Sequence, residues 1–467
     1  MKTECNTSQF KLQALGSRDI IAKFDGGNIT SDSGSILLRE VEKRTHILER
    51  LSGCFTDYRN PKFIEHTVVA LVKQRVLGIA MGYEDLNDHD HLRQDPLLGL
   101  LCEKQDPTGS DRRMLRDKGK STAGKSTLNR LELGTVEINR YKKIVPDMEA
   151  MDDLLVDLFI ESYTKPPETI VFDVDATDDP IHGNQEGRFF HGYYGHYCYL
   201  PLYIFCEDQL LCARLRTADR DASDGVLPEL ERIIKKVRAA WPNVRIIIRG
   251  DSGFMRDSIM SWCETNKIDY VLGLAKNKRL QESIVAEMQE AKRLYEETLQ
   301  KARIFKDFRY QTLNSWTCER RVIGKAEYLN QGENPRFIVT SLGAEFQGED
   351  LYEKLYCARG EMENRIKEQQ LYLFADRTST HWLPANQLRL YFASFAYVLV
   401  ETLRRLALTG TEMAKAQCHT IRLKLFKIGA QIRITVRKVW LSLSESYPLA
   451  DLLGRIWSRL QQIPILS

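Results

Sequence analysis

The 467-residue sequence lacks paired metal-binding cysteines, long apolar runs and a marked excess of charge of either sign. Its ten cysteines are scattered and form no C-x-x-C pair, so a structural zinc site is not expected. No apolar run approaches about eighteen residues and the N-terminal segment has no apolar signal core, so we expect a cytoplasmic protein. The formal net charge is only +3. Any DNA-binding surface must therefore come from local segregation of charge.

The first third of the chain is predicted to be mainly helical. Residues 1–58 combine short apolar stretches with turn signals such as "FDGGNITSDSG", which favour strands or loops. A helix is expected from Asn60, because Pro61 suits a first turn and apolar residues from Phe63 to Ile79 repeat at helical spacing. We interpret residues 1–150 as a mainly helical N-terminal region.

The middle of the chain carries five apolar segments that predict β-strands. They are "TIVFDVDAT" (169–177), "YLPLYIFC" (199–206), "QLLCARLRT" (209–217), "VRIIIRGDSG" (244–253) and "DYVLGLAK" (269–276). An amphipathic helix is expected at 225–241, between the third and the fourth strand. Three hairpin-connected strands followed by alternating helices and strands are typical of an RNase H-like fold, an α/β core with a mixed five-stranded sheet and flanking helices.

Beyond residue 276 the pattern changes. A charged helical stretch (278–302) and three strand-like segments predict a β-rich insertion, after which helical periodicity resumes at 349–374. Residues 386–408 are expected to form an apolar helix, and the tail from 446 a further amphipathic one. Residues 410–440 bear seven basic side chains against Glu412 alone, a bias that favours contact with DNA. The seven are Lys415, Arg422, Lys424, Lys427, Arg433, Arg437 and Lys438.

Three acidic side chains come from the predicted core strands. Asp173 and Asp175 lie two residues apart on one strand, so both point to the same face, and Asp251 ends another strand. Carboxylates in such apolar strands are costly to bury without partners or metal. Carboxylate oxygens are the hard ligands that Mg²⁺ prefers, and two such ions can activate the attacking oxygen and stabilise the leaving one in phosphodiester cleavage.

A fourth acid, Glu363, comes from the later helical segment. Tyr356, Arg359, Glu363 and Lys367 recur at intervals that place them on one helix face. An acid flanked by two bases suits metal binding beside a phosphate backbone. The spacing equally fits an ordinary salt-bridge ladder on a solvated face.

Three motifs together resemble the DDE transposases of bacterial insertion sequences, specifically the insertion sequence 1380 family within the insertion sequence 4 superfamily. The motifs are "FDVDATDDPIHG", with Asp175 in a D-x-T pattern, "IIIRGDSGF" around Asp251, and "YCARGEMENRIKE" with Glu363. The superfamily's third motif is Y-x2-R-x3-E-x6-K, but its lysine position is occupied here by Gln370. Lys367, one helical turn beyond Glu363, is the candidate to replace it.

The resemblance covers essentially the whole chain and implies a set of functional properties. Asp175, Asp251 and Glu363 would coordinate two Mg²⁺ ions, for which Mn²⁺ would substitute, with Asp173 as the reserve for the first position. Tyr356, Arg359 and Lys367 would hold the DNA backbone. The enzyme would cleave the terminal inverted repeats of an insertion element and join the freed 3′-hydroxyl ends to target DNA, acting as a homodimer on double-stranded DNA at the bacterial nucleoid.

The expected functional segments follow the same order. They are an end-binding region (1–150), the first part of the catalytic core (165–276), the insertion subdomain (277–345), the rest of the core (346–400) and a basic C-terminal region for DNA binding or dimerisation (401–467). Within the insertion, Trp316 could stack on an unpaired base, and packing inside a small β-subdomain is the alternative.

Two other patterns point elsewhere. Gly119, Gly124, Lys125 and Ser126 complete a Walker A string, so a P-loop ATPase acting on DNA is one alternative. A P-loop needs a buried strand before its first glycine, however, and "SDRRMLRDK" cannot be one, which favours a basic loop. "LNDHDHL" (86–92) resembles a metal cluster by composition but is interpreted as a solvated turn. A catalytically inactive, sequence-specific DNA-binding protein is the third possibility.

Overall fold

The computed structural model describes residues 9–133 and 139–465, which form two compact units. One unit comprises residues 147–394. The other combines the described parts of the chain up to residue 146 with residues 395–465. No helix in the described ranges is both long and apolar enough to cross a bilayer.

A mixed sheet of nine strands organises residues 147–394, all of which are described. The strand order along the main path is β11-β10-β6-β12-β13-β17-β15-β14, and β16 pairs with β15 outside it. The five strands expected from the sequence are confirmed as β6 (Thr169–Ala176), β10 (Leu202–Cys206), β11 (Gln209–Arg214), β12 (Arg245–Gly250) and β13 (Asp269–Leu274). β10 runs antiparallel to β6 and β11, whereas β12 is parallel to both β6 and β13.

Alternation along β6 separates the main core from the polar face of the sheet. Ile170, Phe172 and Val174 are buried in the largest apolar cluster, together with residues of α8 (Val226–Ala240) such as Ile233. Because side chains of a strand alternate between its two faces, the odd-numbered Asp173 and Asp175 point to the opposite face. The helix predicted over 225–241 is confirmed by α8.

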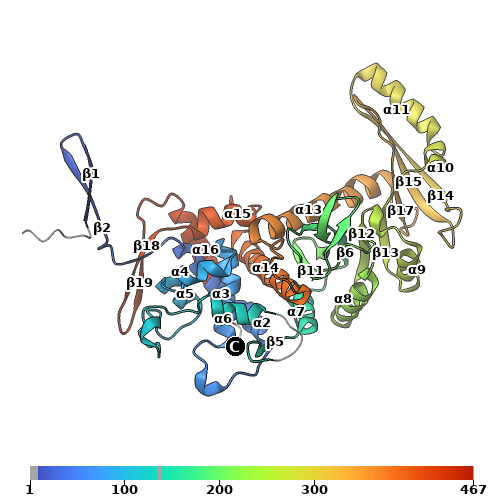
Figure 1. The fold of residues 1–467 in the computed structure, drawn as a ribbon. Helices are drawn as coiled ribbons and strands as arrows, with labels where there is room; N and C mark the ends of the chain where they lie inside the picture. The colour runs from blue at the N-terminus through green and yellow to red at the C-terminus, as the bar shows by residue number, and fades with distance from the viewer. Residues whose placement is uncertain (1–8, 134–138, 466–467) are drawn as a thin grey trace, which may run out of the picture. The chain divides into compact units, whose positions relative to one another are not determined.

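The predicted insertion extends the same sheet. The three strand-like segments are confirmed as β14 (Ala302–Tyr310), β15 (Arg320–Leu329) and β17 (Arg336–Thr340). β17 pairs antiparallel with β13, so the added strands continue the sheet from its edge. Figure 1 shows α11 (Val285–Thr298) lying along the β14–β15 hairpin.

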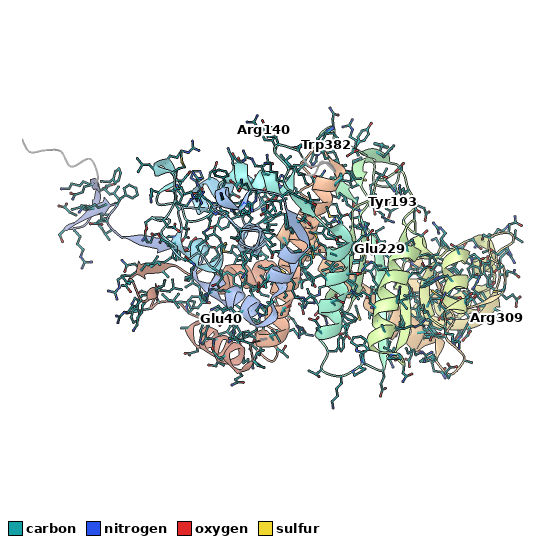
Figure 2. The ribbon with its side chains drawn as sticks, turned by 90° about the horizontal axis from the view of Figure 1, so that it is seen from below. Glu40, Arg140, Tyr193, Glu229, Arg309 and Trp382 are labelled. Atoms are coloured by element: carbon teal, nitrogen blue, oxygen red, sulfur yellow. The ribbon has the colours of Figure 1, made fainter. Side chains whose placement is uncertain are left out.

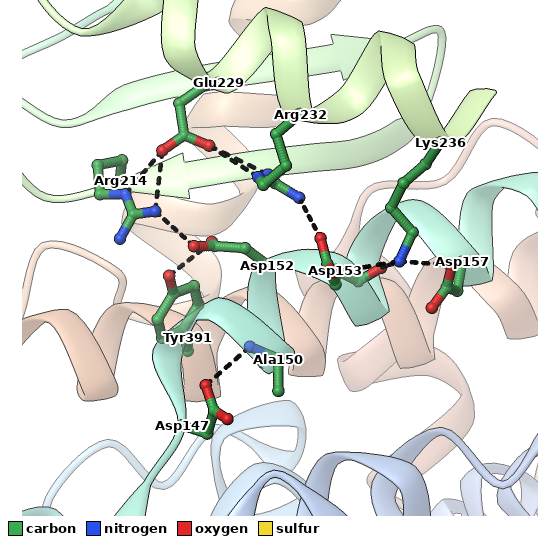
Figure 3. A network of polar contacts seen from close by, with 10 residues as sticks. All are labelled: Asp147, Ala150, Asp152, Asp153, Asp157, Arg214, Glu229, Arg232, Lys236 and Tyr391. Atoms are coloured by element: carbon green, nitrogen blue, oxygen red, sulfur yellow. Dashed lines mark hydrogen bonds and ion pairs between the residues drawn. The ribbon is translucent and has the colours of Figure 1, made fainter. Parts of the chain in front are cut away.

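A charged network joins three helices to strand β11 (Figure 3). Asp152 of α7 (Met148–Glu161) is buried, accepts a 2.6 Å hydrogen bond from the Tyr391 hydroxyl on α14 (Leu383–Leu403) and pairs with Arg214 of β11. Arg214 also donates to Glu229 of α8 at 2.8 Å. A buried carboxylate requires such compensation, and here it fixes α7 and α14 beside the sheet.

The other unit departs from the sequence prediction near its start. Residues 36–45 and 47–53 form α1 (Ile36–Thr45) and α2 (Ile47–Gly53), where strands or loops were expected. The helix expected from Asn60 begins only at Val68, as α3 (Val68–Met81), because the Thr67 side chain accepts the Ala70 amide at 3.2 Å and caps it there. That boundary prediction was wrong.

The remaining elements of this unit are short, apart from α16 (Ala450–Gln462), which confirms the expected amphipathic tail helix. β1 (Gln9–Leu15) and β2 (Arg18–Lys23) form an exposed hairpin. β18 (Ala430–Ile434) and β19 (Val439–Leu443), in the C-terminal segment predicted only as basic, form a three-stranded sheet with β3 (Asn28–Thr30).

A buried neutral histidine makes this unit sensitive to acid. The Gln74 amide lies 3.1 Å from His89 Nδ1, and since the amide nitrogen only donates, Nδ1 accepts and the ring proton is on Nε2. His89 is fully buried, and burial with the nearby charge of Arg75 lowers its pKa from 6.5 to about 3. Below pH 6.5 His89 is therefore protonated in the unfolded chain but stays neutral in the folded state, so acid favours unfolding.

We expect the stability of this unit to fall by about 1.4 kcal/mol for each pH unit below 6.5, down to pH 3, through His89 alone. Chemical denaturation at pH 7, 6 and 5 measures the slope. The variant His89→Asn keeps an acceptor for Gln74 without titrating, so its slope should be smaller by that amount. Equal slopes would contradict the assignment.

Candidate active site

Two neighbouring strands bring their polar side chains to one face of the sheet. In the parallel pairing of β6 and β12, Arg249 is the register partner of Asp173. Two residues further along, the same alternation places Asp175 on β6 beside Asp251, which directly follows β12. The register, which the sequence does not specify, therefore sets the first two predicted carboxylates side by side.

Asp173 is neutralised inside the protein. Its side chain is 3% exposed and forms a bidentate pair with Arg249, whose Nη2 lies 2.7 Å from Asp173 Oδ2. Arg249 also donates to the Leu355 carbonyl, at the helical segment that carries Glu363. Burial raises the pKa of Asp173, and Arg249 opposes that shift. Arg249 was not singled out in the sequence, although a lone base in an apolar strand is a usable signal.

Asp175 faces the third motif instead. Arg359 Nη2 lies 2.6 Å from Asp175 Oδ1, and Arg359 Nη1 lies 2.9 Å from Glu363 Oε1. Burial raises the pKa of Asp175 to about 6; Arg359 opposes this shift, and the charges of Asp251 and Glu363 add to it. One guanidinium therefore lies among the three carboxylates of the predicted triad, and its own pKa is raised by all three.

Asp251 is held by a tight turn at the end of β12. Its Oδ1 accepts a 2.9 Å hydrogen bond from the Gly253 amide and caps the short turn Ser252–Phe254. Gly273 of β13 lies against this turn: a Cβ built there would be 2.5 Å from the Tyr356 hydroxyl and 3.2 Å from the Asp251 carbonyl carbon. Glycine at 273 thus lets Tyr356 approach the turn, and burial and Asp251 raise the pKa of Tyr356.

The segment that carries Glu363 is helical but irregular. A π-helical stretch (Leu351–Tyr356), a 3-10 turn (Cys357–Arg359), α13 (Gly360–Lys367) and a second π-helical stretch (Glu368–Tyr372) follow one another. The helical spacing assumed from the sequence therefore holds within α13, for Glu363 and Lys367, but the winding is not uniform across the π-helical stretch and the 3-10 turn that precede it.

The last part of the third motif, from Lys367 to Gln370, makes no ion pair with the three carboxylates in the described part of the chain. Lys367 is exposed at the end of α13. Gln370, at the motif's lysine position, donates from Nε2 to the Asp178 carbonyl at 2.9 Å. This bond ties the Glu363 segment to the chain just beyond Asp175. A lysine at position 370 would place a charged ammonium group there instead of the neutral amide.

An aromatic hairpin follows the strand that carries Asp175. It comprises β8 (Phe189–His191) and β9 (His196–Tyr199), and the intervening Tyr193 is 87% exposed, at the surface in Figure 2. The pKa of Tyr194 is raised by burial and by the charges of Asp178, Asp175 and Asp251. His196 Nε2 lies 2.8 Å from Asp178 Oδ2, so β9 is tied to the chain just beyond Asp175.

The donor set of this site suits a hard divalent cation. Asp175, Asp251 and Glu363 offer only carboxylate oxygens; burial raises the pKa of Asp175 and the charges of Asp251 and Glu363 add to that shift, so positive charge at this position stabilises the ionised acids. Across the described ranges, 9–133 and 139–465, no three acidic, histidine or cysteine side chains already enclose a metal position. The guanidinium of Arg359 lies between two of the acids, Asp175 and Glu363, and pairs with both.

The residues predicted to contact DNA fall into two groups. Trp316 is 5% exposed and packs edge-on against Tyr310 at 5.7 Å, so its placement matches the packing alternative. Arg422 is buried and donates to the Ala80 carbonyl at 2.9 Å, at the end of α3, while Lys427 pairs with Asp32. Lys424, Arg433, Arg437 and Lys438 are exposed.

The exposed basic residues gather on the β18–β19 hairpin. Arg433 and Trp440 are cross-strand partners, and the cations of Arg433 and Lys438 lie 5.8 Å and 5.3 Å from the centre of the Trp440 ring. Trp440 is 46% exposed. The hairpin therefore presents cations and an aromatic face together, a combination suited to a nucleic-acid backbone and its bases.

The Walker A string does not form a P-loop. A 3-10 turn, Leu115–Asp117, precedes Gly119, and Lys125 lies on α6 (Lys125–Glu132) with its Nζ 3.6 Å from Asp90 Oδ2. The strand that would deliver the glycine-rich loop to a phosphate is thus replaced by an irregular turn.

Comparison with known proteins agrees with the three motifs. The family description "Transposase DDE domain group 1" matches residues 12–465. A cryo-EM structure of a piggyBac transposase synaptic complex with hairpin DNA is similar at a TM-score of 0.41 and 10% identity, covering 85% of this chain and 80% of that one. No curated protein sequence gives a significant match. The chain belongs to the DDE transposase family, group 1.

Proposed function

We propose that the chain is the transposase of a bacterial insertion sequence, of the insertion sequence 1380 family. The observation that carries the proposal is the convergence of Asp175 and Glu363 on Arg359, with Asp251 at the end of the adjacent strand. The enzyme would bind terminal inverted repeats, cleave DNA and join the 3′-hydroxyl ends to target DNA.

The sheet order supports an RNase H-like core for this activity. Numbered along the chain, the first five strands of the large sheet lie in the order third, second, first, fourth, fifth, and the second runs opposite to the other four. The three carboxylates then follow from the first strand, the end of the fourth strand and a helical segment beyond the insertion. This is the arrangement expected of the predicted fold.

Asp175, Asp251 and Glu363 are the residues that would hold two Mg²⁺ ions. When bound, these ions would supply electrostatic stabilisation of the phosphoryl group and activation of the attacking oxygen. Tyr356 and Lys367 would position the DNA backbone, and Arg359 would exchange carboxylate partners for phosphate oxygens, which its planar fork matches equally well.

Recognition of the element's ends would involve both terminal regions. The β18–β19 hairpin, with Arg433, Arg437 and Lys438, is the proposed contact in the C-terminal segment 401–467, and residues 1–150 would supply the rest. Arg422 and Lys427 would support the fold rather than touch DNA, since both already bond within the protein. A homodimer would bring two ends together.

The test is cleavage of a duplex that carries the terminal repeat. Wild-type protein with Mg²⁺ should nick it, and Asp251→Ala should lose nicking while still binding the duplex, because Asp251 ends a strand in a half-exposed turn. Glu282→Ala, which removes an exposed carboxylate paired with Lys278 at the surface, is the control. Binding without nicking by the wild type would identify an inactive DNA-binding protein, and a requirement for ATP would revive the ATPase alternative.

A further inference from the structure

A cavity in the N-terminal part of the chain concentrates positive charge. It belongs to another unit than Asp175, Asp251 and Glu363. Its volume is about 590 Å³, and its lining comes entirely from residues 59–130. Six basic side chains line it against three acidic ones, Glu65, Asp90 and Asp117. The six are Arg59, Arg93, Arg112, Arg116, Lys120 and Arg130. This segregation is the kind of local charge that the near-neutral composition conceals.

The acids do not cancel this charge. Glu65 pairs with Arg112 at 3.1 Å, and Asp117 lies 3.7 Å from Arg93. Lys120 Nζ donates to the Arg116 carbonyl at 2.7 Å, and within the part of the chain that the structure describes neither Lys120 nor Arg130 pairs with a carboxylate. Two cations at the cavity are therefore available to an incoming anion.

A buried histidine donor is left without an acceptor in the same cavity. His66 is 5% exposed, and Lys104 Nζ lies 3.4 Å from its Nδ1. An ammonium group only donates, so Nδ1 accepts and the ring proton is on Nε2. Within residues 9–133 and 139–465, no acceptor reaches that Nε2 or the buried Nε of Arg93. Unsatisfied buried donors are rare and demand a partner.

The Walker-like segment forms one wall of this cavity. Gly124 and Ser126 line it at the start of α6, and a Cβ built on Gly124 would lie 2.7 Å from Arg93 Nη1. Glycine at 124 therefore allows the Arg93 guanidinium to approach the start of the helix. Lys125 is not among the lining residues; its amide donates to Asp90 at 3.0 Å.

We infer that this cavity binds a phosphate group. An anion with several acceptor oxygens satisfies both the two unpaired N–H donors and the excess of cations, and guanidinium forks match phosphate geometry. The phosphate comes either from the backbone of DNA or from a free phosphate compound. Only the DNA source rests on the proposed function.

The test compares four full-length variants. The double variant Lys120→Gln/Arg130→Gln removes the two unpaired cations, both of which lie outside the core. His66→Leu removes the buried donor, and His66→Gln restores one. Lys165→Gln/Lys235→Gln, two exposed lysines of the unit comprising residues 147–394, is the charge-matched control. Thermal unfolding confirms that each variant is folded.

In the first arm, inorganic pyrophosphate is titrated calorimetrically at constant ionic strength, without DNA or metal. We expect the double variant and His66→Leu to bind at least about tenfold more weakly than the control, with recovery in His66→Gln. In the second arm, duplex binding is measured against salt, and the double variant should lower the slope of log affinity against log salt by about 1.8 if both cations contact backbone phosphates.

The two arms separate the sources. A loss of pyrophosphate binding with unchanged duplex binding assigns the cavity to free phosphate compounds, and a loss of duplex affinity and slope assigns it to the DNA backbone. Variants that match the control in both arms overturn the proposal. The first arm remains informative if the wild type fails to cleave DNA, so failure of the cavity and failure of the transposase proposal are distinguishable.

Discussion

Asp175→Asn should reduce metal-dependent nicking by about a thousandfold or more, which corresponds to a loss of about 4 kcal/mol of transition-state stabilisation. The amide keeps the size of the side chain but removes the negative charge that Arg359, Asp251 and Glu363 surround. Nicking of a repeat-bearing duplex in Mg²⁺ measures the rate, and a mobility shift of the same duplex measures binding, which should be retained.

The informative comparison is Asp173→Asn on the same strand. Asp173 is already neutralised by Arg249, so its substitution should alter the stability of the fold more than the rate of nicking. Asp157→Asn on α7, a partly exposed surface carboxylate, controls for the chemical change. If folded Asp173→Asn loses nicking as completely as Asp175→Asn, then Asp175 has no special role among the β6 carboxylates.

Arg249→Leu should destabilise the unit comprising residues 147–394 by about 3–5 kcal/mol, because it leaves a buried carboxylate without its partner. Arg245→Leu on the same strand removes an ion pair whose arginine is 41% exposed, and should cost at most about 1 kcal/mol. The midpoint of chemical denaturation, followed by tryptophan fluorescence, compares the two variants.

The double variant Asp173→Asn/Arg249→Leu provides the internal check. It removes both charges, so it should recover part of the stability that Arg249→Leu loses. If Arg249→Leu is no more destabilising than Arg245→Leu, the Asp173–Arg249 pair does not carry the burial cost assigned to it.

The long core strands were predictable because they are buried on both sides. The segments at 169–177 and 244–253 combine apolar, β-branched residues with few polar ones, and most of their residues are buried. The small β8–β9 sheet was not predictable in the same way, since its exposed aromatic residues follow no apolar alternation. The start of α3 was misplaced because Pro61 gave a helix signal that the Thr67 cap overrode.

The acidic residues of the candidate site were predictable from the sequence, but the arginine that pairs with each of them was not. Asp173 and Asp175 share a face, so their spacing could not separate them, and only the register with β12 assigns Arg249 to the first and leaves Arg359 to the second. Lys367 lies one turn beyond Glu363 within α13, as the spacing predicts, whereas the π-helical stretch and the 3-10 turn before α13, which carry Tyr356 and Arg359, could not be read from the spacing.

The pairing of β17 with β13 has a mechanical consequence. The insertion is not suspended on a hinge: its outer strands are joined by backbone hydrogen bonds, strand by strand, to β12 and so to the turn of Asp251. A load on the β14–β15 hairpin is therefore transmitted through the sheet rather than absorbed by a flexible linker. We therefore expect the β14–β15 hairpin to keep a constant distance from the turn of Asp251.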